Sequence, residues 1–133
     1  MTSFYLDSSA IVKLVLEEVG SAELRAAIAG ASLVTSRIAV VEVCKAIARV
    51  EPAADPRVTL DAFAFVELDE ELSWHAAGTG RAYLRALDAI HVASAVLLGE
   101  EVAGFLTYDG RQADAAKDAG LQVLSPGVEL PDA

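Results

Sequence analysis

Four acidic residues occupy positions from which a folded chain can gather them into one site. They are Asp7, Glu42, Asp88 and Asp109. Asp7 directly follows the apolar run at residues 4–6, and Asp109 comes just after a second such run at residues 104–107. Because ligand crevices in open α/β sheets lie at the carboxyl ends of the strands, we expect both residues at the edge where chemistry is usually done.

Each acid taken singly also has a purely structural interpretation. Asp7 and Asp88 stand before apolar helical patterns and are suitable N-caps, and Asp109 precedes Gly110 in a turn. Glu42 shares a helical stripe with Lys45 and Arg49, as expected for a solvated face with a weak ion pair. No single acid therefore establishes a site.

Considered together, the acids predict a metal site. Parallel strands bring Asp7 and Asp109 to one edge of the sheet. Two ionised carboxylates so near each other repel unless a cation lies between them. Hard cations such as Mg²⁺ or Mn²⁺ prefer oxygen ligands, whereas the lack of a His or Cys ligand set argues against zinc. Such ions suit phosphoryl chemistry. The hydroxyls of Ser9 and Thr107 adjoin two of the acids and can orient a carboxylate or a metal-bound water.

Strand and helix patterns alternate along the chain. Apolar runs predict strands at residues 4–6, 32–35, 65–68, 104–107 and 121–124. Helical patterns occupy residues 10–18, 24–29, 37–50, 58–62, 70–77, 88–98 and 112–119, with Ser21 and Ser36 as expected N-caps. This alternation predicts a three-layer α/β domain with a mainly parallel central sheet and helices on both faces. We expect one domain over residues 1–133, with a loose C-terminal tail from about residue 126.

The composition limits the classes of protein that fit. Hydrophobic residues make up 54% of the chain, yet no apolar run reaches membrane-spanning length and no signal peptide is apparent. The single cysteine, Cys44, lies in an apolar segment and is expected to be a buried thiol of a cytoplasmic protein. The net charge of −10 excludes a simple phosphate-binding surface, so nucleic acid would need cations or local basic residues. Neither GxGxxG nor GxxxxGK[ST] occurs, so no dinucleotide or P-loop site is supported.

The stretches that carry the acids resemble the PIN-domain toxins of the VapC type. The resemblance rests on residues 5–10, Glu42 within an apolar helix, the run at 84–95 and the run at 106–109. It implies a PIN-like fold and a metal-dependent endoribonuclease, the toxin of a toxin–antitoxin pair, usually dimeric and neutralised by a small VapB-type antitoxin. Carried over residue by residue, Asp7, Glu42, Asp88 and Asp109 would bind one or two Mg²⁺ or Mn²⁺ ions and form the catalytic site, with Ser9 and Thr107 nearby. His91 belongs to the motif as a packing or hydrogen-bonding residue.

The chain departs from the family pattern in two places. Lys45 stands where an arginine is common, and the segment at residues 50–65 is short for the helical arm often used in dimer and antitoxin contacts. Because the overall charge opposes RNA, local basic residues must hold it. We nominate Lys45, Arg49, Arg81 and Arg85.

Two other functions remain open at this stage. A phospho-acceptor module of the response-regulator kind also places acids and Mg²⁺ at strand ends. It normally needs paired acids after the first strand and a lysine after the last, whereas Asp7 precedes two serines and no lysine follows Leu124. The other alternative is a domain of this fold that has lost catalysis and only binds a partner.

Overall fold

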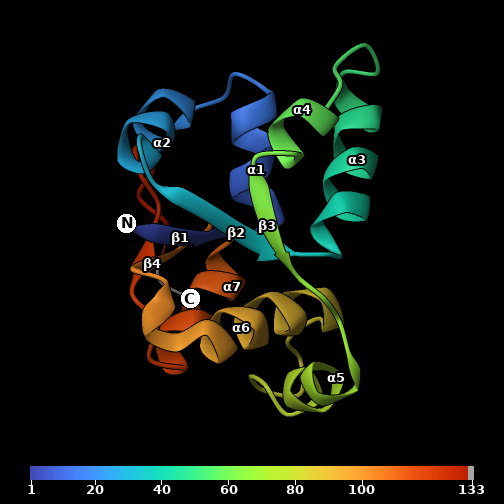
Figure 1. Cartoon of the computed structure of the whole chain (residues 1–133), viewed down its shortest axis with the longest axis vertical. Helices are drawn as coiled ribbons and strands as arrows, with labels where there is room; N and C mark the ends of the chain where they lie inside the picture. The colour runs from blue at the N-terminus through green and yellow to red at the C-terminus, as the bar shows by residue number, and fades with distance from the viewer. Residues whose placement is uncertain (132–133) are drawn as a thin grey trace.

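The central layer is a five-stranded sheet in which every pairing is parallel. The computed structural model describes residues 1–131, and its strands run in the order β3-β2-β1-β4-β5 (Figure 1). Their bounds are β1 (Ser3–Leu6), β2 (Ser32–Ser36), β3 (Phe63–Val66), β4 (Gly104–Leu106) and β5 (Val123–Leu124). The first strand lies at the centre, paired with β2 on one side and β4 on the other. The predicted parallel three-layer architecture is therefore confirmed.

Helices cover both faces of this sheet. They are α1 (Ser8–Val15), α2 (Ser21–Ile28), α3 (Ala39–Val50), α4 (Arg57–Leu60), α5 (Glu70–Ala77), α6 (Ala86–Leu98) and α7 (Gly110–Asp118), with a short 3₁₀ turn, η1 (Gly99–Glu101). Figure 1 shows α1 to α4 above the sheet and α5 to α7 below it. Since α3 and α6 approach from opposite faces, one edge of the sheet can receive side chains from both helical layers.

Alternation along the strands divides the core in two. Leu6 and Leu106 point toward α1 to α4, where they pack with Ile11, whereas Tyr5 and Phe105 point toward α6 and α7. The Tyr5 and Phe105 rings stack with centroids 5.3 Å apart. This period of two is what a parallel sheet covered on both faces requires. It also fixes Asp7 at the next position, at the end of β1.

Several sequence predictions of local structure were wrong. The third strand begins at Phe63 rather than at residue 65, because Phe63 pairs with Leu33 and buries its ring in the core. Ser21 is not the cap of α2: Gly20 takes that position at φ 93°, and the Ser21 hydroxyl donates to the Leu16 carbonyl. Ser36 precedes the start of α3 and accepts a hydrogen bond from the Ile38 amide instead.

Cys44 and Asp88 also differ from their predicted environments. Cys44 is exposed on α3 rather than buried, because Val43 and Ile47 form the face of that helix that packs on the core. Asp88 is not an N-cap, since α6 already begins at Ala86 with Arg85 in the capping position. The Asp88 side chain is thereby freed from a capping role.

The segment after β5 contacts the body of the protein at its start. Ser125 donates to the Thr107 carbonyl at 2.8 Å, and the Tyr108 hydroxyl donates to the Pro126 carbonyl at 2.8 Å. Of the predicted tail at residues 126–133, residues 132–133 lie outside the described residues. Within residues 1–131, no helix has the length and apolar character needed to cross a bilayer.

Replacement of Leu24 by alanine tests the core beneath α2. Leu24 is fully buried among the residues that pack α1 to α4 on the sheet. We expect Leu24→Ala to lower the free energy of unfolding by about 2–5 kcal/mol, the usual result of an unfilled cavity. Val19→Ala, at a side chain that is 76% exposed, is the control and should change it little. Equal losses in urea denaturation of the two variants would contradict this packing.

Candidate active site

Asp7 is fully buried at the carboxyl end of β1, where it both caps a helix and faces the sheet edge. Its Oδ1 accepts hydrogen bonds from the Ala10 amide at 3.0 Å and the Ser9 hydroxyl at 2.6 Å, and its Oδ2 accepts one from the Thr107 hydroxyl. Burial raises the pKa of Asp7, although nearby His91 and these hydrogen bonds oppose the rise. A cap alone does not need a carboxylate buried this deeply.

Two hydroxyls join the end of β1 to the end of β4. Ser9 Oγ accepts a hydrogen bond from the Tyr108 amide at 2.9 Å while it donates to Asp7. Thr107 Oγ1 likewise accepts from the Asp109 amide at 3.0 Å while it donates to Asp7. Each hydroxyl therefore uses both its donor and its acceptor capacity. The pair fixes the loop that carries Asp109 against the loop that carries Asp7.

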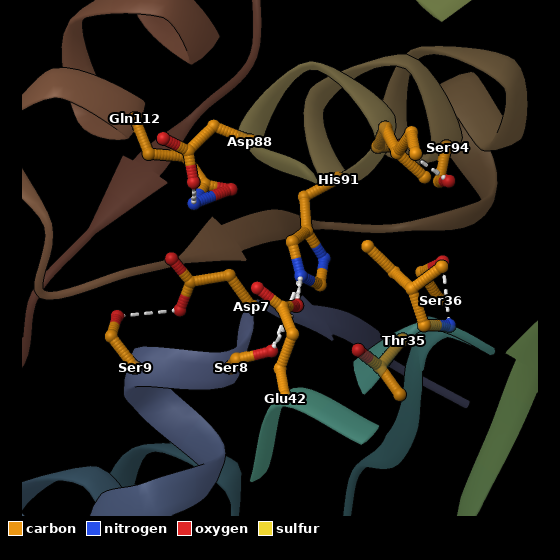
Figure 2. A network of polar contacts seen from close by, with 12 residues as sticks. Asp7, Ser8, Ser9, Thr35, Ser36, Glu42, Asp88, His91, Ser94 and Gln112 are labelled. Carbon is orange, nitrogen blue, oxygen red and sulfur yellow. Dashed lines mark hydrogen bonds and ion pairs between the residues drawn. The ribbon is translucent and has the colours of Figure 1, made fainter. Parts of the chain in front are cut away.

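Glu42 reaches the same edge from the first turn of α3. Its Oε1 accepts hydrogen bonds from the Ser8 hydroxyl at 2.6 Å and from His91 Nε2 at 2.7 Å (Figure 2). Partial burial acts to raise the pKa of Glu42, but the hydrogen bond and charge of His91 together with Ser8 outweigh it and hold the pKa below its ordinary value. Glu42 is therefore a carboxylate kept ionised, rather than a member of a solvated ion pair with Lys45.

His91 is a buried link between the two helical layers. Its Nδ1 lies 2.8 Å from the Tyr5 hydroxyl, and its Nε2 points to Glu42. A carboxylate only accepts hydrogen bonds, so Nε2 carries a proton, and in the neutral ring Nδ1 accepts from Tyr5. Figure 2 shows the imidazole extending from α6 toward Glu42 and Ser8. His91 is thus a hydrogen-bonding residue of the site.

Gln112 connects the two remaining acids. Its side-chain Nε2 donates to Asp88 Oδ1 at 3.2 Å, and its backbone amide donates to Asp109 Oδ1, also at 3.2 Å. Asp109 is the N-cap of α7 and accepts from the Arg111 amide as well. Partial burial raises the pKa of Asp88, and the charge of Asp109 raises it further. The two carboxylates therefore face one another across Gln112.

The donors leave one oxygen of most acids open. Glu42 Oε2, Asp88 Oδ2 and Asp109 Oδ2 accept no hydrogen bond from residues 1–131, although the other oxygen of each is bonded. The Gln112 Oε1 atom is buried and also has no partner in the described part of the chain. In that same part of the chain, no Lys or Arg forms a salt bridge with any of the four acids. The result is a group of like charges with unoccupied oxygen acceptors.

This donor set fits a hard, hydrated cation. Within residues 1–131, no three Asp, Glu, His or Cys side chains gather closely enough to enclose an ion by themselves. Mg²⁺ does not need such a cage, because it keeps several waters and is usually bound by one or two carboxylates. The open oxygens and the mutual repulsion around Asp88 are what such an ion would relieve. The residues present are therefore compatible with Mg²⁺ or Mn²⁺.

The nominated RNA-contact residues lie on the surface. Lys45 and Arg49 are exposed on α3, and Arg81 and Arg85 are exposed in the segment before α6. None of them has a hydrogen bond to the acids among the described residues. Their nomination stays a prediction.

Three side chains that shape the site do not stand out in the sequence. The sequence pattern indicates Ser9 rather than Ser8, and it predicts Tyr5 only as part of a buried strand. It predicts Gln112 only as the start of a helix. Gln112 lies on the side of α7 that carries buried Ala113 and Ala116, and a polar residue on such a face was the available signal. No local pattern identified Tyr5, because its partner His91 is 86 residues away.

Comparison with known proteins shows one matching family and several similar proteins. Residues 4–118 match the PIN domain family. The chain is 34% identical over 132 residues to Ribonuclease VapC47 of Mycobacterium tuberculosis, covering 93% of this chain and 97% of that protein. It is 38% identical over 129 residues to Ribonuclease VapC46 of the same species, covering 95% and 99%.

Solved structures show the same fold at lower identity. The crystal structure of Mycobacterium tuberculosis VapC20, described as a sarcin-ricin loop cleaving toxin, aligns with TM-score 0.65 and 15% identity over 92% of this chain and 99% of that one. FitAcB from Neisseria gonorrhoeae aligns with TM-score 0.69 and 19% identity, covering 92% and 97%. At these identities the likeness concerns the fold alone.

The raised pKa of Asp7 predicts a pH dependence of stability in metal-free protein. The folded state holds the Asp7 proton more tightly than the unfolded chain, whose pKa is near the ordinary 3.8. The ionised carboxylate thus destabilises the fold above the raised pKa, and this cost is relieved as pH falls through it. Asp7→Asn cannot ionise. We therefore expect the melting temperature of wild type minus that of Asp7→Asn to rise as pH falls from 7 to about 4 in EDTA.

Thermal melts of both proteins at several pH values measure this difference. Asp61→Asn, at an exposed carboxylate, is the control for general charge effects. A difference that stays flat, or that falls on acidification, would show that burial does not dominate at Asp7.

Proposed function

Because this chain belongs to the PIN domain family, we propose that it is a metal-dependent endoribonuclease, the toxin component of a VapBC-type toxin–antitoxin pair. The observation that carries the proposal is that Asp7, Glu42 and Asp109 lie near enough to act on the charge of Asp88, with no Lys or Arg paired to any of the four acids among residues 1–131. Relatives named as VapC ribonucleases, similar over more than nine-tenths of the chain, support it.

The acids would hold one or two Mg²⁺ or Mn²⁺ ions through the oxygens that the protein leaves open. Such open oxygens belong to Glu42, Asp88 and Asp109, whereas Asp7 would bind through oxygens that also accept from Ser9, Thr107 and the Ala10 amide. When bound, such an ion supplies an activated water and neutralises charge on the attacking and leaving oxygens of a phosphodiester. Hydrolysis also needs an acceptor for the proton of the water. Asp88 is suited to that role, because its pKa is raised and it is only partly buried.

The remaining polar residues keep the carboxylates in place. Ser9 and Thr107 fix the rotamer of Asp7, and Ser8 with His91 fix that of Glu42. These donors are three hydroxyls and one imidazole. They orient the acids but reduce the negative charge of the carboxylates less than a Lys or Arg would. The site therefore stays attractive to cations.

The proposed partners follow from the charge of the chain. RNA would approach along exposed basic residues, for which Lys45, Arg49, Arg81 and Arg85 are the candidates. A VapB-type antitoxin would inhibit by placing a Lys or Arg among the acids, where the described residues 1–131 pair none with them. We also propose a homodimer, as implied by the VapC resemblance.

Of the alternatives, the response-regulator module loses its basis, since the chain belongs to another family. A catalytically inactive PIN domain remains the second candidate, and cleavage assays decide between it and the enzyme.

The first test is metal-dependent cleavage. Purified protein should cleave RNA with Mg²⁺ or Mn²⁺ and stop when EDTA is added, and Asp7→Asn should lower the rate by orders of magnitude. The same variant should gain less melting temperature from added Mg²⁺, because ligand-linked stabilisation follows affinity for the folded state. Asp61→Asn should behave as wild type in both assays. Cleavage that survives thorough chelation, or an Asp7→Asn protein with normal rate and normal Mg²⁺ response, would overturn the proposal.

The second test concerns Gln112 as a positioning residue. Gln112→Met keeps the length of the side chain but removes the donor to Asp88 and the unpartnered Oε1 together, so stability should change little. Loss of a residue that hydrogen-bonds to a metal ligand typically costs about 10–100-fold in metal affinity or activity. We expect a corresponding rise in the Mg²⁺ concentration needed for half-maximal cleavage. Gln122→Met, at an exposed position, is the matched control. A purely structural role would change melting without moving the Mg²⁺ dependence.

A further inference from the structure

A hollow of about 250 Å³ lies between α7 and the turn that precedes α6. One wall is the turn from Gly80 to Leu84, which contributes Arg81 and Tyr83. The other wall is a single stripe of α7, formed by Arg111, Asp114, Ala115 and Asp118. Most of the lining is apolar, and of its residues the function proposed above uses only Arg81.

Both walls continue directly into segments that carry acids of the site. Leu84 is four residues before Asp88, and Arg111 is two residues after Asp109, whose carboxylate caps the same helix. Residues so near along the chain cannot lie far apart in space, because an extended chain spans at most about 3.6 Å per residue. Asp88 and Asp109 are themselves joined through Gln112. A chain bound at the acids can therefore reach the hollow with its next unit.

Tyr83 is an aromatic side chain with little of its surface covered. It is 73% exposed, whereas Tyr5 and Phe105 are fully buried in the core. Its turn is held in shape, because the Leu84 amide donates to the Arg81 carbonyl at 2.9 Å and Gly80 adopts φ 74°. An added Cβ at Gly80 would lie 2.4 Å from the Leu84 side chain, so the turn is tightly closed. Tyr83 is thus presented to solvent by a constrained segment.

The charged residues around Tyr83 suit a nucleotide. Arg81 and Arg111 line the hollow together with Asp114 and Asp118, so two cationic groups stand there on a chain of net charge −10. Arg85, which follows the lining residue Leu84 in sequence, is exposed before α6. Guanidinium groups bind phosphate and stack on bases, and single-stranded nucleic acid is held by basic residues together with exposed aromatic faces. An apolar hollow beside an exposed tyrosine fits a flat ring better than it fits a phosphate alone.

The two aspartates that line the hollow indicate which RNA base would fit it. Asp114 is half-buried and Asp118 exposed, and both line the hollow. A carboxylate only accepts hydrogen bonds, so it favours a base edge that presents donors. Guanine alone among the four RNA bases presents two adjacent donors, N1–H and the 2-amino group, which match the two oxygens of one carboxylate.

We propose that this hollow is a subsite for an unpaired guanine of the RNA substrate, stacked on Tyr83 with its Watson–Crick edge toward Asp114. The arginines Arg81 and Arg111 would contact the flanking phosphates. The inference rests on the proposed ribonuclease function, and it adds the base that is read beside the cleavage site. Recognition of splayed-out single-stranded bases by aromatic stacking and edge contacts is the usual mode for RNA.

Binding is measured on the Asp7→Asn protein, so that cleavage does not interfere. The probes are fluorescent single-stranded RNA octamers that contain one guanosine among adenosines, and the same octamers with inosine, which lacks only the 2-amino group. Fluorescence anisotropy gives the Kd. In this background we expect Tyr83→Ala to raise Kd about ten-fold, in line with the loss of one stacked base, and Tyr83→Phe to bind within two-fold of the parent. Asp114→Ala should abolish the preference for guanosine over inosine.

The matched control is Trp74→Ala, at an aromatic side chain on α5 that is also 73% exposed but does not line the hollow. It should leave Kd unchanged. Equal effects of Tyr83→Ala and Trp74→Ala, or equal binding of the guanosine and inosine octamers by the parent, would overturn the subsite. The anisotropy measurement does not depend on catalysis. Wild-type protein that fails to cleave RNA with Mg²⁺ therefore refutes the nuclease, whereas a subsite failure appears as normal cleavage with unchanged Kd in Tyr83→Ala.

Discussion

A carboxylate that is fully buried at the end of the central strand is the constraint on which the site depends. Asp7 keeps its place because the Ala10 amide and the Ser9 and Thr107 hydroxyls satisfy it. Burying a charge costs free energy unless hydrogen bonds or counter-charges compensate it. Here the compensation is only partial, since the pKa of Asp7 is raised. The fold thus retains some electrostatic strain at the point where a cation is proposed to bind.

Hydrogen bonds also hold the other three acids, and their donors come from both helical layers. Glu42 comes from α3 above the sheet and is fixed by His91 from α6 below it, so one hydrogen bond spans the edge of the sheet. Asp88 and Asp109 come from α6 and from the start of α7, and Gln112 ties them together. In every case, hydroxyl, amide or imidazole donors bond one oxygen of the carboxylate and leave the other open. Hydrogen bonds from these groups, rather than ion pairs with Lys or Arg, therefore set the geometry of the four acids.

The residues proposed to bind a cation and those proposed to bind RNA lie in different places on the protein. The interior edge concentrates negative charge, as a metal site requires, while RNA must be held by cations elsewhere on an acidic chain. The arginines nearest in sequence to Asp88 and Asp109 are Arg85 and Arg111, and of these Arg111 lines the hollow beside Tyr83. Cation binding and base recognition would then occupy neighbouring parts of one surface, connected by the first turns of α6 and α7.

The parallel three-layer fold and the order of its elements could be predicted from the sequence, because strand and helix periods are local and alternate clearly from residue 4 to residue 124. The sequence also identified Asp7, Glu42, Asp88 and Asp109 as candidates, since acids that follow apolar runs or interrupt an apolar helix stand out in the chain. Helix and strand ends were less certain: the capping of α2 by Gly20 and the start of β3 at Phe63 depend on packing and register with distant strands. Only the tertiary structure decided that Cys44 faces solvent, and that Ser8, Tyr5 and Gln112 serve the acids. Their contacts join residues 24 to 86 positions apart, and which side chains meet across such separations depends on how the two helical layers close over the sheet, which no local pattern encodes.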